Sequence, residues 1–182
     1  MKTKTDIKNR FVIIMAGGRG ERFWPVSREK TPKQLLALLG KRSFLQEAVD
    51  RVLPLVPAKN IFIITNEAQL PEVRKQLPKI PKQNLIAEPI GRDTCAAVTL
   101  GAALVGARST TGVMAVLPAD HVIPDEKKFQ QVLNDSFDLA ARGQAAGGGG
   151  GNPELVAGLD IQPAFVLVLT GRAQFPDPGV LG

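Results

Sequence analysis

Residues 11–22 read FVIIMAGGRGER, an apolar run that passes directly into a turn rich in glycine. The run Phe11–Met15 has the composition of a buried strand. Ligands of open α/β sheets bind at the carboxyl ends of strands, which is where this turn lies. Glycine lets the backbone approach a ligand closely, and successive N–H groups can form an anion-binding concavity. We therefore predict that the turn binds a polyphosphate through the backbone of Ala16, Gly17, Gly18 and Gly20.

Positively charged side chains lie in and after the turn and add to its attraction for phosphate: Arg19, Arg22, Arg28, Lys30 and Lys33. The spacing differs from two common nucleotide motifs. The turn does not have the form G-x-x-x-x-G-K-[ST], and Phe23 stands where the dinucleotide fingerprint has its third glycine. The alternative interpretation is a structural glycine turn surrounded by solvated charges.

The length of 182 residues and the hydrophobic content of 44% indicate one domain, or one domain plus a tail, with enough apolar residues for a core. The net charge of +6 favours acidic ligands such as nucleotides and sugar phosphates. Nucleic acid is the weaker alternative, because aromatic residues make up only 5% and no nucleic-acid-binding motif is present. We predict small phosphorylated ligands and no nucleic-acid partner.

Cys95 is the only cysteine, which excludes an intramolecular disulfide and a zinc site built from several cysteines. Because it lies among small residues, we expect it to be a buried packing residue. Residues 1–10 lack the apolar core of a signal peptide, and no apolar run approaches the roughly 20 residues that span a bilayer. We expect a soluble cytoplasmic protein without a membrane partner.

Apolar strand-like runs alternate with helical patterns along the first 144 residues. The predicted strands cover 11–15, 61–65, 85–87 and 113–117. One helix is predicted to begin at Ser43, with Gln46 completing a capping box, and others over 67–77, 95–107 and 127–142. This order predicts an α/β fold with a mainly parallel sheet and helices on both faces. Residues 1–10 are expected to form a loose arm, and 34–39 a short strand or one helical turn.

Five residues around the glycine turn match the pattern G-x-G-x-R followed by P-K: Gly18, Gly20, Arg22, Pro32 and Lys33. This pattern resembles the signature of the sugar-phosphate nucleotidylyltransferases. Residues 23–28 and the ending with Gln34 are similar to the mannose-1-phosphate guanylyltransferase branch, the GDP-mannose pyrophosphorylases. The resemblance covers about residues 10–144 and implies a Rossmann-like nucleotidylyltransferase core.

The chain from about residue 145 onward carries no resemblance to that family. Ala145–Gly151 is a low-complexity stretch that predicts a flexible linker, and 165–169 is compatible with one strand. Members of the family continue with sugar-binding strands and are longer, so we expect a truncated core. The predicted division is a nucleotide-binding part, 8–144, and a linker with an unmatched tail, 145–182.

The segment from Glu88 to Thr94 resembles the family's motif E-P-x-G-R-[ND]-T and follows a predicted strand. Guanine presents two adjacent donors, and a carboxylate can accept from both. We therefore predict that Glu88 reads guanine, with Pro89 and Gly91 also in the nucleotide site. The alternative is that Asp93 or Thr94 only caps the following helix.

Leu117–His121 resembles the family's motif L-P-[AS]-D-H. An acidic residue at the carboxyl end of a strand can hold Mg²⁺ through oxygen, so Asp120 is the candidate metal ligand and Mg²⁺ the expected cofactor. The family supplies a second aspartate from its C-terminal part, for which we find no aligned equivalent. His121, the only histidine, is expected to have a structural or supporting role rather than that of a base.

The resemblance implies that GTP and mannose 1-phosphate react to give GDP-mannose and pyrophosphate. In this reaction Arg22 would stabilise charge on the phosphates and Lys33 would bind the α-phosphate. A homodimer of the full-length enzyme is compatible with the sequence. Two alternatives stay open. One is a nucleotidylyltransferase that uses another sugar 1-phosphate or nucleotide, and the other is an inactive nucleotide-binding fragment.

Overall fold

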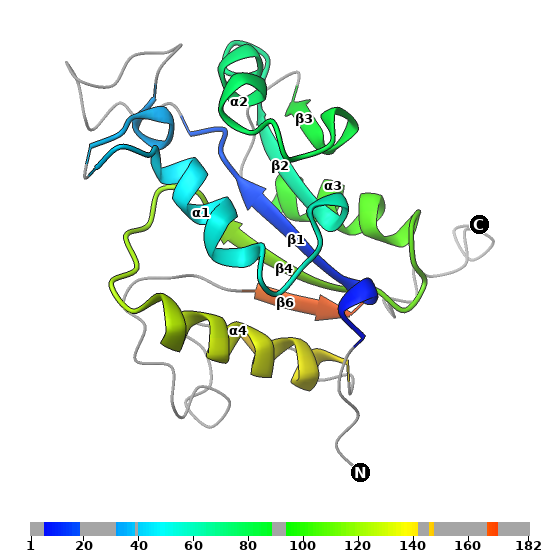
Figure 1. The fold of residues 1–182 in the computed structure, drawn as a ribbon. Helices are drawn as coiled ribbons and strands as arrows, with labels where there is room; N and C mark the ends of the chain where they lie inside the picture. The colour runs from blue at the N-terminus through cyan, green and yellow to red at the C-terminus, as the bar shows by residue number, and fades with distance from the viewer. Residues whose placement is uncertain are drawn as a thin grey trace, which may run out of the picture.

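A computed structural model describes residues 6–18, 32–38, 40–88 and 94–141, together with the backbone of 146–147 and 167–170. Within these residues six strands form one sheet in the order β3-β2-β1-β4-β6-β5 (Figure 1). Their bounds are β1 Arg10–Met15, β2 Ile61–Asn66, β3 Leu85–Glu88, β4 Val113–Pro118, β5 Ala146–Gly147 and β6 Leu167–Thr170. The first four strands are parallel, and β6 runs antiparallel to β4. The predicted mainly parallel sheet is confirmed.

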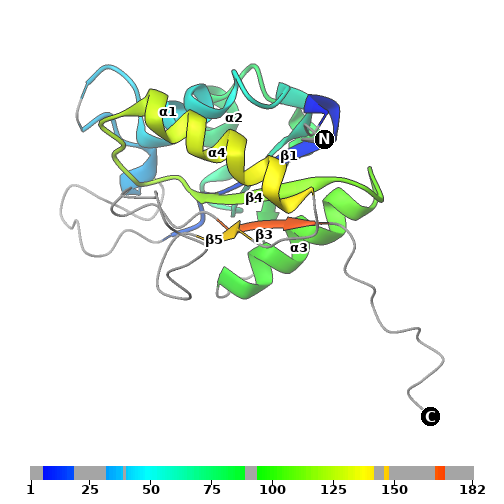
Figure 2. The ribbon, with the colours of Figure 1, turned by 90° about the horizontal axis from the view of Figure 1, so that it is seen from below.

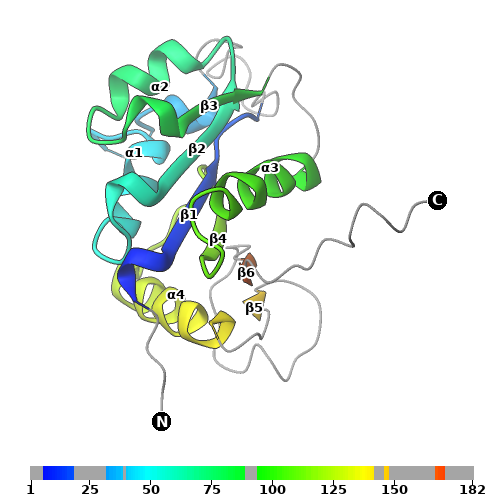
Figure 3. The same cartoon turned by 90° about the vertical axis from the view of Figure 1, so that its right-hand side faces the viewer.

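Helices cover both faces of this sheet. The described residues form α1 Phe44–Val52, α2 Leu70–Gln76, α3 Thr94–Gly106 and α4 Glu126–Ala140. Figures 2 and 3 show α1, α2 and α4 on one face and α3 on the other. Side chains of β1 alternate accordingly, because Val12 and Ile14 belong to the core under the three helices and Phe11 and Ile13 to the core under α3. No helix in the described part of the chain combines the length and the apolar character needed to cross a bilayer.

Helix α3 packs closely on β1 through a stripe of small residues. Ala97, Gly101 and Val105 are its buried positions, four residues apart. A Cβ atom on Gly101 would lie 2.8 Å from Cγ1 of Ile13, so only glycine allows this approach without a shift. Cys95 is exposed, and the expectation that it is buried was wrong. It precedes the stripe by two residues, which turns it about 200° away from the sheet.

The expectation of a loose arm was wrong for residues 6–10. Ile7–Asn9 form a 3₁₀ turn, and Arg10 is already part of β1 and only 2% exposed. Its guanidinium donates to Asn134 Oδ1 at 2.9 Å and to Asp138 Oδ1 at 3.1 Å, both on α4. A buried arginine needs such partners. Both partners lie on a helix that is distant in the sequence, so the residues around Arg10 gave no indication of them.

Buried asparagines join the strands at their amino ends. Asn60 and Asn84 each end a 3₁₀ turn that precedes a strand. The amide nitrogen of Asn60 donates to the carbonyls of Lys8 and Arg10, at 3.0 and 2.9 Å. That of Asn84 donates to the carbonyls of Lys59 and Ile61, at 2.9 and 2.8 Å. Each asparagine therefore binds the carbonyls on both sides of the residue just before the neighbouring strand, which is Asn9 before β1 and Asn60 before β2.

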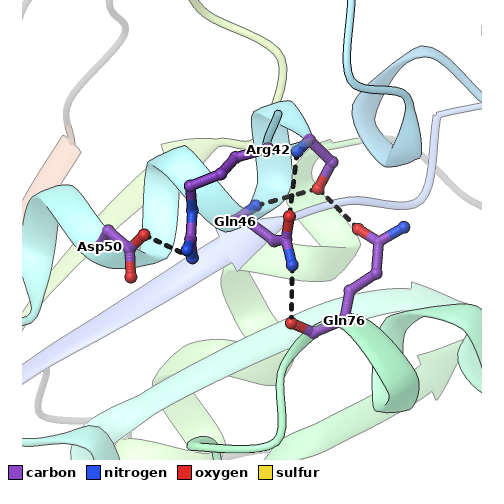
Figure 4. A network of polar contacts seen from close by, with 5 residues as sticks. Arg42, Gln46, Asp50 and Gln76 are labelled. Atoms are coloured by element: carbon purple, nitrogen blue, oxygen red, sulfur yellow. Dashed lines mark hydrogen bonds and ion pairs between the residues drawn. The ribbon is translucent and has the colours of Figure 1, made fainter. Parts of the chain in front are cut away.

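Helix α1 begins as predicted, at a capping box formed by Ser43 and Gln46. Figure 4 shows that Gln46 also points at Gln76 at the end of α2, while Arg42 pairs with Asp50 along α1. The amide of Gln76 donates in turn to the carbonyl of Leu35, at 3.1 Å. Leu35 ends the 3₁₀ turn Lys33–Leu35, the single helical turn that was one of two expectations for this segment. The network therefore ties this turn to α1 and α2.

Candidate active site

The candidate site lies where the strand order reverses. Strand β1 has β2 on one side and β4 on the other, so the segments that follow β1 and β4 diverge from a common edge (Figure 1). Such switch points are where open α/β sheets bind ligands. Lys33 Nζ lies 3.9 Å from Asp120 Oδ2 and so connects the segment after β1 with the segment after β4. The structure thus brings together two residues that the sequence placed 87 positions apart.

The glycine turn starts from a fixed position between its two neighbours. The N–H of Ala16 donates to the carbonyl of Ile64 at 2.7 Å, and the N–H of Ala119 donates to the carbonyl of Met15 at 3.0 Å. After this point the turn is held through its carbonyl groups. Side-chain amides donate to the carbonyls of Ala16 and Gly18, and more weakly to that of Gly17. Within the described part of the chain, the N–H groups of Gly17 and Gly18 donate no hydrogen bond.

The two described glycines of the turn have no packing partner that would require glycine. A Cβ atom on Gly18 would meet no atom within 4 Å, and one on Gly17 would lie 3.8 Å from Glu88 Oε2, an ordinary contact distance. Neither residue has the positive φ that favours glycine. Neither packing nor backbone conformation among the described residues therefore requires glycine here, and the phosphate-binding role of the turn stays a prediction.

Glu88 ends β3 beside the glycine turn and is partly exposed. Burial raises the pKa of its carboxyl above the ordinary value. A ligand that donates a hydrogen bond stabilises the charged form of a carboxyl that is partly removed from water. A Cβ atom on Gly17 would lie 3.8 Å from Glu88 Oε2, so the predicted base-reading group lies close to the predicted phosphate-binding group.

Lys33 and Asp120 differ in exposure. The side chain of Lys33 is 22% exposed and that of Asp120 44%. Lys33 Nζ also lies 5.4 Å from the centre of the Phe44 ring. His121 Nε2 is 3.9 Å from Asp120 Oδ1, and its buried Nδ1 has no hydrogen-bond partner among the described residues. His121 therefore lies beside the predicted metal ligand, and the supporting role assigned to it stays a prediction.

The side chains at this edge suit a metal ion that is coordinated mainly by substrate phosphates. Among the described residues, no group of three or more His, Cys, Asp or Glu side chains could hold a metal ion. Mg²⁺ is usually bound through one or two carboxylates together with substrate phosphates. The half-exposed Asp120 carboxylate, beside the turn that is predicted to bind phosphate, fits that pattern.

Four of the predicted site residues lie outside the described residues: Gly20, Arg22, Pro89 and Gly91. Sequence reasoning assigned no role to four side chains that the structure places against the turn, namely Gln34, Thr65, Asn66 and Gln69. Thr65 offered one signal, because it is a polar residue at the end of a buried apolar run. Gln34 offered a second signal as the last residue of the family-like ending, although that resemblance gave it no role. Glutamines near a helix start are usually exposed, so Gln69 offered none.

Comparison with known proteins agrees with this arrangement. The family model described as "Nucleotidyl transferase" matches residues 11–153. A mannose-1-phosphate guanylyltransferase of Salmonella muenchen is 40% identical over 136 residues, which are 72% of this chain and 28% of that protein. A protein of the same description from Escherichia coli is 38% identical over 133 residues, with the same coverage. The chain thus spans just over a quarter of the length of these relatives.

A solved structure agrees over more of the fold. The protein from Thermus thermophilus described as "mannose-1-phosphate geranyltransferase" superimposes with a TM-score of 0.71 at 26% identity. The match covers 90% of this chain and 58% of that one. Together with the match of the family model to most of the sequence, the parallel sheet and its glycine turn establish that this chain belongs to the nucleotidyl transferase family.

Proposed function

We propose that this chain forms the nucleotide-binding part of an enzyme that transfers GMP from GTP to mannose 1-phosphate and releases pyrophosphate. One observation carries the proposal. A glycine turn, whose Gly17 and Gly18 N–H groups donate no hydrogen bond within the described part of the chain, lies between a partly buried carboxylate, Glu88, and the pair Lys33–Asp120. The guanylyltransferase relatives named above support the choice of GTP and mannose 1-phosphate.

The phosphate groups of GTP would lie over the turn. The N–H groups of Gly17 and Gly18 can donate to phosphate oxygens, and the Lys33 ammonium adds a charge that favours the phosphate. Arg22, predicted from the motif, would neutralise charge as pyrophosphate leaves. An oxygen of the sugar phosphate forms the new bond to the α-phosphorus while the bond to the β-phosphate oxygen breaks. This reaction requires positioning and charge neutralisation rather than a protein nucleophile.

Two carboxylates would have different tasks. Asp120 would hold Mg²⁺ together with phosphate oxygens, and the ion would neutralise negative charge on them. Glu88 would accept from the two adjacent donors of guanine, which adenine does not present. A base without two adjacent donors would leave an oxygen of this carboxylate without its hydrogen bond. The loss of such a hydrogen bond discriminates strongly between ligands.

The test combines binding and product formation on the same preparation. GTP, ATP and UTP are titrated with Mg²⁺ by calorimetry, and pyrophosphate release is then assayed with mannose 1-phosphate and glucose 1-phosphate. The proposal predicts the tightest binding for GTP and product only with mannose 1-phosphate. Equal affinity for all three nucleotides would contradict the role of Glu88. Binding of GTP without product would favour the alternative of a chain that only binds nucleotide.

A further inference from the structure

We propose that Gln34 and Gln69 act as positioning residues. In this proposal the buried Gln34 amide binds the Ala16 carbonyl and so directs the Gly17 N–H at the ligand's phosphates, and Gln69 accepts from Gln34 and holds its amide in that orientation. We call these two side chains the amide clamp. The inference rests on the proposed function for the identity of the ligand, a nucleoside triphosphate. It concerns residues that contact the turn rather than the ligand.

The burial of the clamp is the first observation. Gln34 is 4% exposed and Gln69 is 1% exposed, although glutamine is a residue of the surface. A buried amide is costly unless it is hydrogen-bonded. Gln34 Nε2 lies 2.8 Å from the carbonyl oxygen of Ala16 and 2.9 Å from that of Gly18. Gln69 Nε2 lies 3.4 Å from the same oxygen of Gly18.

The second observation is that the surroundings determine which end of the Gln34 amide faces the turn. Its nitrogen has three acceptors within reach, two carbonyl oxygens of the turn and Gln69 Oε1 at 3.3 Å. A flipped amide would place its oxygen against all three. The hydroxyl of Thr65 lies 3.2 Å from Gln69 Oε1 and can donate to it. The turn therefore faces donors, and its carbonyls point toward the protein.

The direction of the N–H groups follows from the peptide bond. In a trans peptide the C=O and N–H point in opposite directions. The carbonyl of Ala16 shares its peptide unit with the N–H of Gly17, and the carbonyl of Gly17 with the N–H of Gly18. Carbonyls held toward the clamp and Asn66 therefore turn these N–H groups away from the protein. Without the clamp, rotation of a peptide unit would present its oxygen to the phosphates and repel them.

The position of Gln34 couples the clamp to the candidate catalytic charge. Gln34 follows Lys33 in the 3₁₀ turn Lys33–Leu35. The same turn therefore supplies the ammonium that approaches Asp120 and the amide that orients the glycine turn. The hydrogen bond from Gln76 to the carbonyl of Leu35 holds this turn from the far side.

A clamp of this kind predicts an effect on phosphate binding alone. We would compare wild type with Gln34→Met and Gln69→Met, which keep the approximate length of the side chain and remove its donor. The matched control is Asn84→Met, which removes a buried amide at the opposite edge of the sheet. Calorimetry with Mg²⁺ measures dissociation constants for guanosine, GMP, GTP and inorganic tripolyphosphate, and thermal unfolding shows that each variant is folded.

We expect Gln34→Met to weaken GTP and tripolyphosphate binding by about tenfold or more and guanosine binding by less than about twofold. Gln69→Met should show the same pattern with a smaller change, because Gln69 acts on the Ala16 carbonyl only through its hydrogen bond with Gln34. Asn84→Met should keep the wild-type ratio of GTP to guanosine affinity. An equal loss for guanosine and GTP in Gln34→Met, or no loss for either, would overturn the clamp.

The two proposals fail differently. If wild type binds tripolyphosphate but does not prefer guanine nucleotides, the proposed function fails while tripolyphosphate still tests the clamp. If wild type prefers GTP and both clamp variants bind it normally, only the clamp fails. If Gln34→Met does not fold, Gln69→Met decides, and loss of folding in both variants would show a purely structural role. Wild type that binds neither GTP nor tripolyphosphate would contradict both proposals.

Discussion

The two ends of the parallel sheet use the same chemical device for different purposes. At the amino ends, Asn60 and Asn84 donate to carbonyls of the neighbouring chain segment. At the carboxyl ends, Gln34 and Gln69 donate to carbonyls of the glycine turn. In both places a buried amide binds backbone oxygen, but the asparagines hold segments that enter strands, whereas the glutamines hold a turn that leaves one.

The difference lies in the N–H groups on the other side of the backbone. Beyond the asparagines the chain enters the sheet, and its N–H groups take part in the strand ladders. Beyond the glutamines the N–H groups of Gly17 and Gly18 have no acceptor in the described part of the chain. A buried amide therefore stabilises the fold at one end, and at the other it holds a turn whose N–H groups we propose as donors to a ligand. We expect mutations at the two ends to separate stability from activity.

The largest effect is expected for Lys33→Ala at the carboxyl end. Removing one charge-stabilising donor typically costs about 2.7–4 kcal/mol of transition-state stabilisation, or about 10²–10³-fold in rate. Pyrophosphate release with GTP and mannose 1-phosphate measures the loss, and the melting temperature should change little. Lys75→Ala, which removes an ammonium that is 81% exposed on α2, is the control and should leave the rate unchanged. Normal turnover in a folded Lys33→Ala variant would show that Lys33 has no role in the mechanism.

Asn84→Ala at the amino end should have the opposite profile. It leaves the carbonyls of Lys59 and Ile61 without this donor and removes the acceptor of Arg108. Each buried group left unsatisfied costs about 1–3 kcal/mol, so we expect a loss of about 3 kcal/mol in the free energy of unfolding. Urea denaturation measures this loss. GTP affinity of the folded fraction should stay at the wild-type value, and a specific loss of GTP affinity would erase the contrast between the two ends.

Glu88→Gln tests the base-reading side of the carboxyl end. Glutamine offers one acceptor oxygen and places a donor against guanine, so we expect the preference for GTP over ATP to fall by about tenfold or more. Competition between the two nucleotides measures this ratio. An unchanged ratio in a folded variant would place guanine recognition on other groups.

The same carboxyl predicts a dependence on pH. Because burial raises the pKa of Glu88, the preference for GTP should decline as pH falls through that raised pKa, where the carboxylate becomes protonated. The folded state binds this proton more tightly than the unfolded state does. The stability contribution of Glu88 is therefore fully present below its ordinary pKa and is lost as pH rises through the raised value. Nucleotide competition as a function of pH should show this dependence in wild type and not in Glu88→Gln.

The smallest effect on stability is expected for Gly18→Ala. The added Cβ meets no atom within 4 Å and the backbone is not left-handed, so the free energy of unfolding should rise or stay within about 1 kcal/mol. GTP affinity should nevertheless fall, because the methyl group occupies the surface over the turn. Gly101→Ala is the contrasting variant. Its Cβ would lie 2.8 Å from Ile13, and it should destabilise the fold.

Several elements were predictable because their causes are local. The apolar runs predicted strands β1, β2 and β4 with nearly correct bounds, and the spacing of Ser43 and Gln46 predicted the capping box. Helix α2 begins at Leu70 rather than at 67, because the Asn66 side chain accepts from the N–H of Gln69 and holds a turn before it. The antiparallel pairing of β6 with β4 was not predicted either, since one apolar run contains no information about its partner.

The sequence alone determined where the candidate ligand-binding residues lie along the chain. Glu88 ends a strand, and Gly17, Gly18 and Asp120 follow strands. Parallel strands end at one edge of their sheet, so the motifs converge there. The tertiary structure alone decided which way the glycine turn faces. Its carbonyls are bound by Gln34 and Gln69, which lie 16 and 51 residues from Gly18. The burial and direction of an amide depend on partners that only folding brings within hydrogen-bond distance, and no local pattern encodes them.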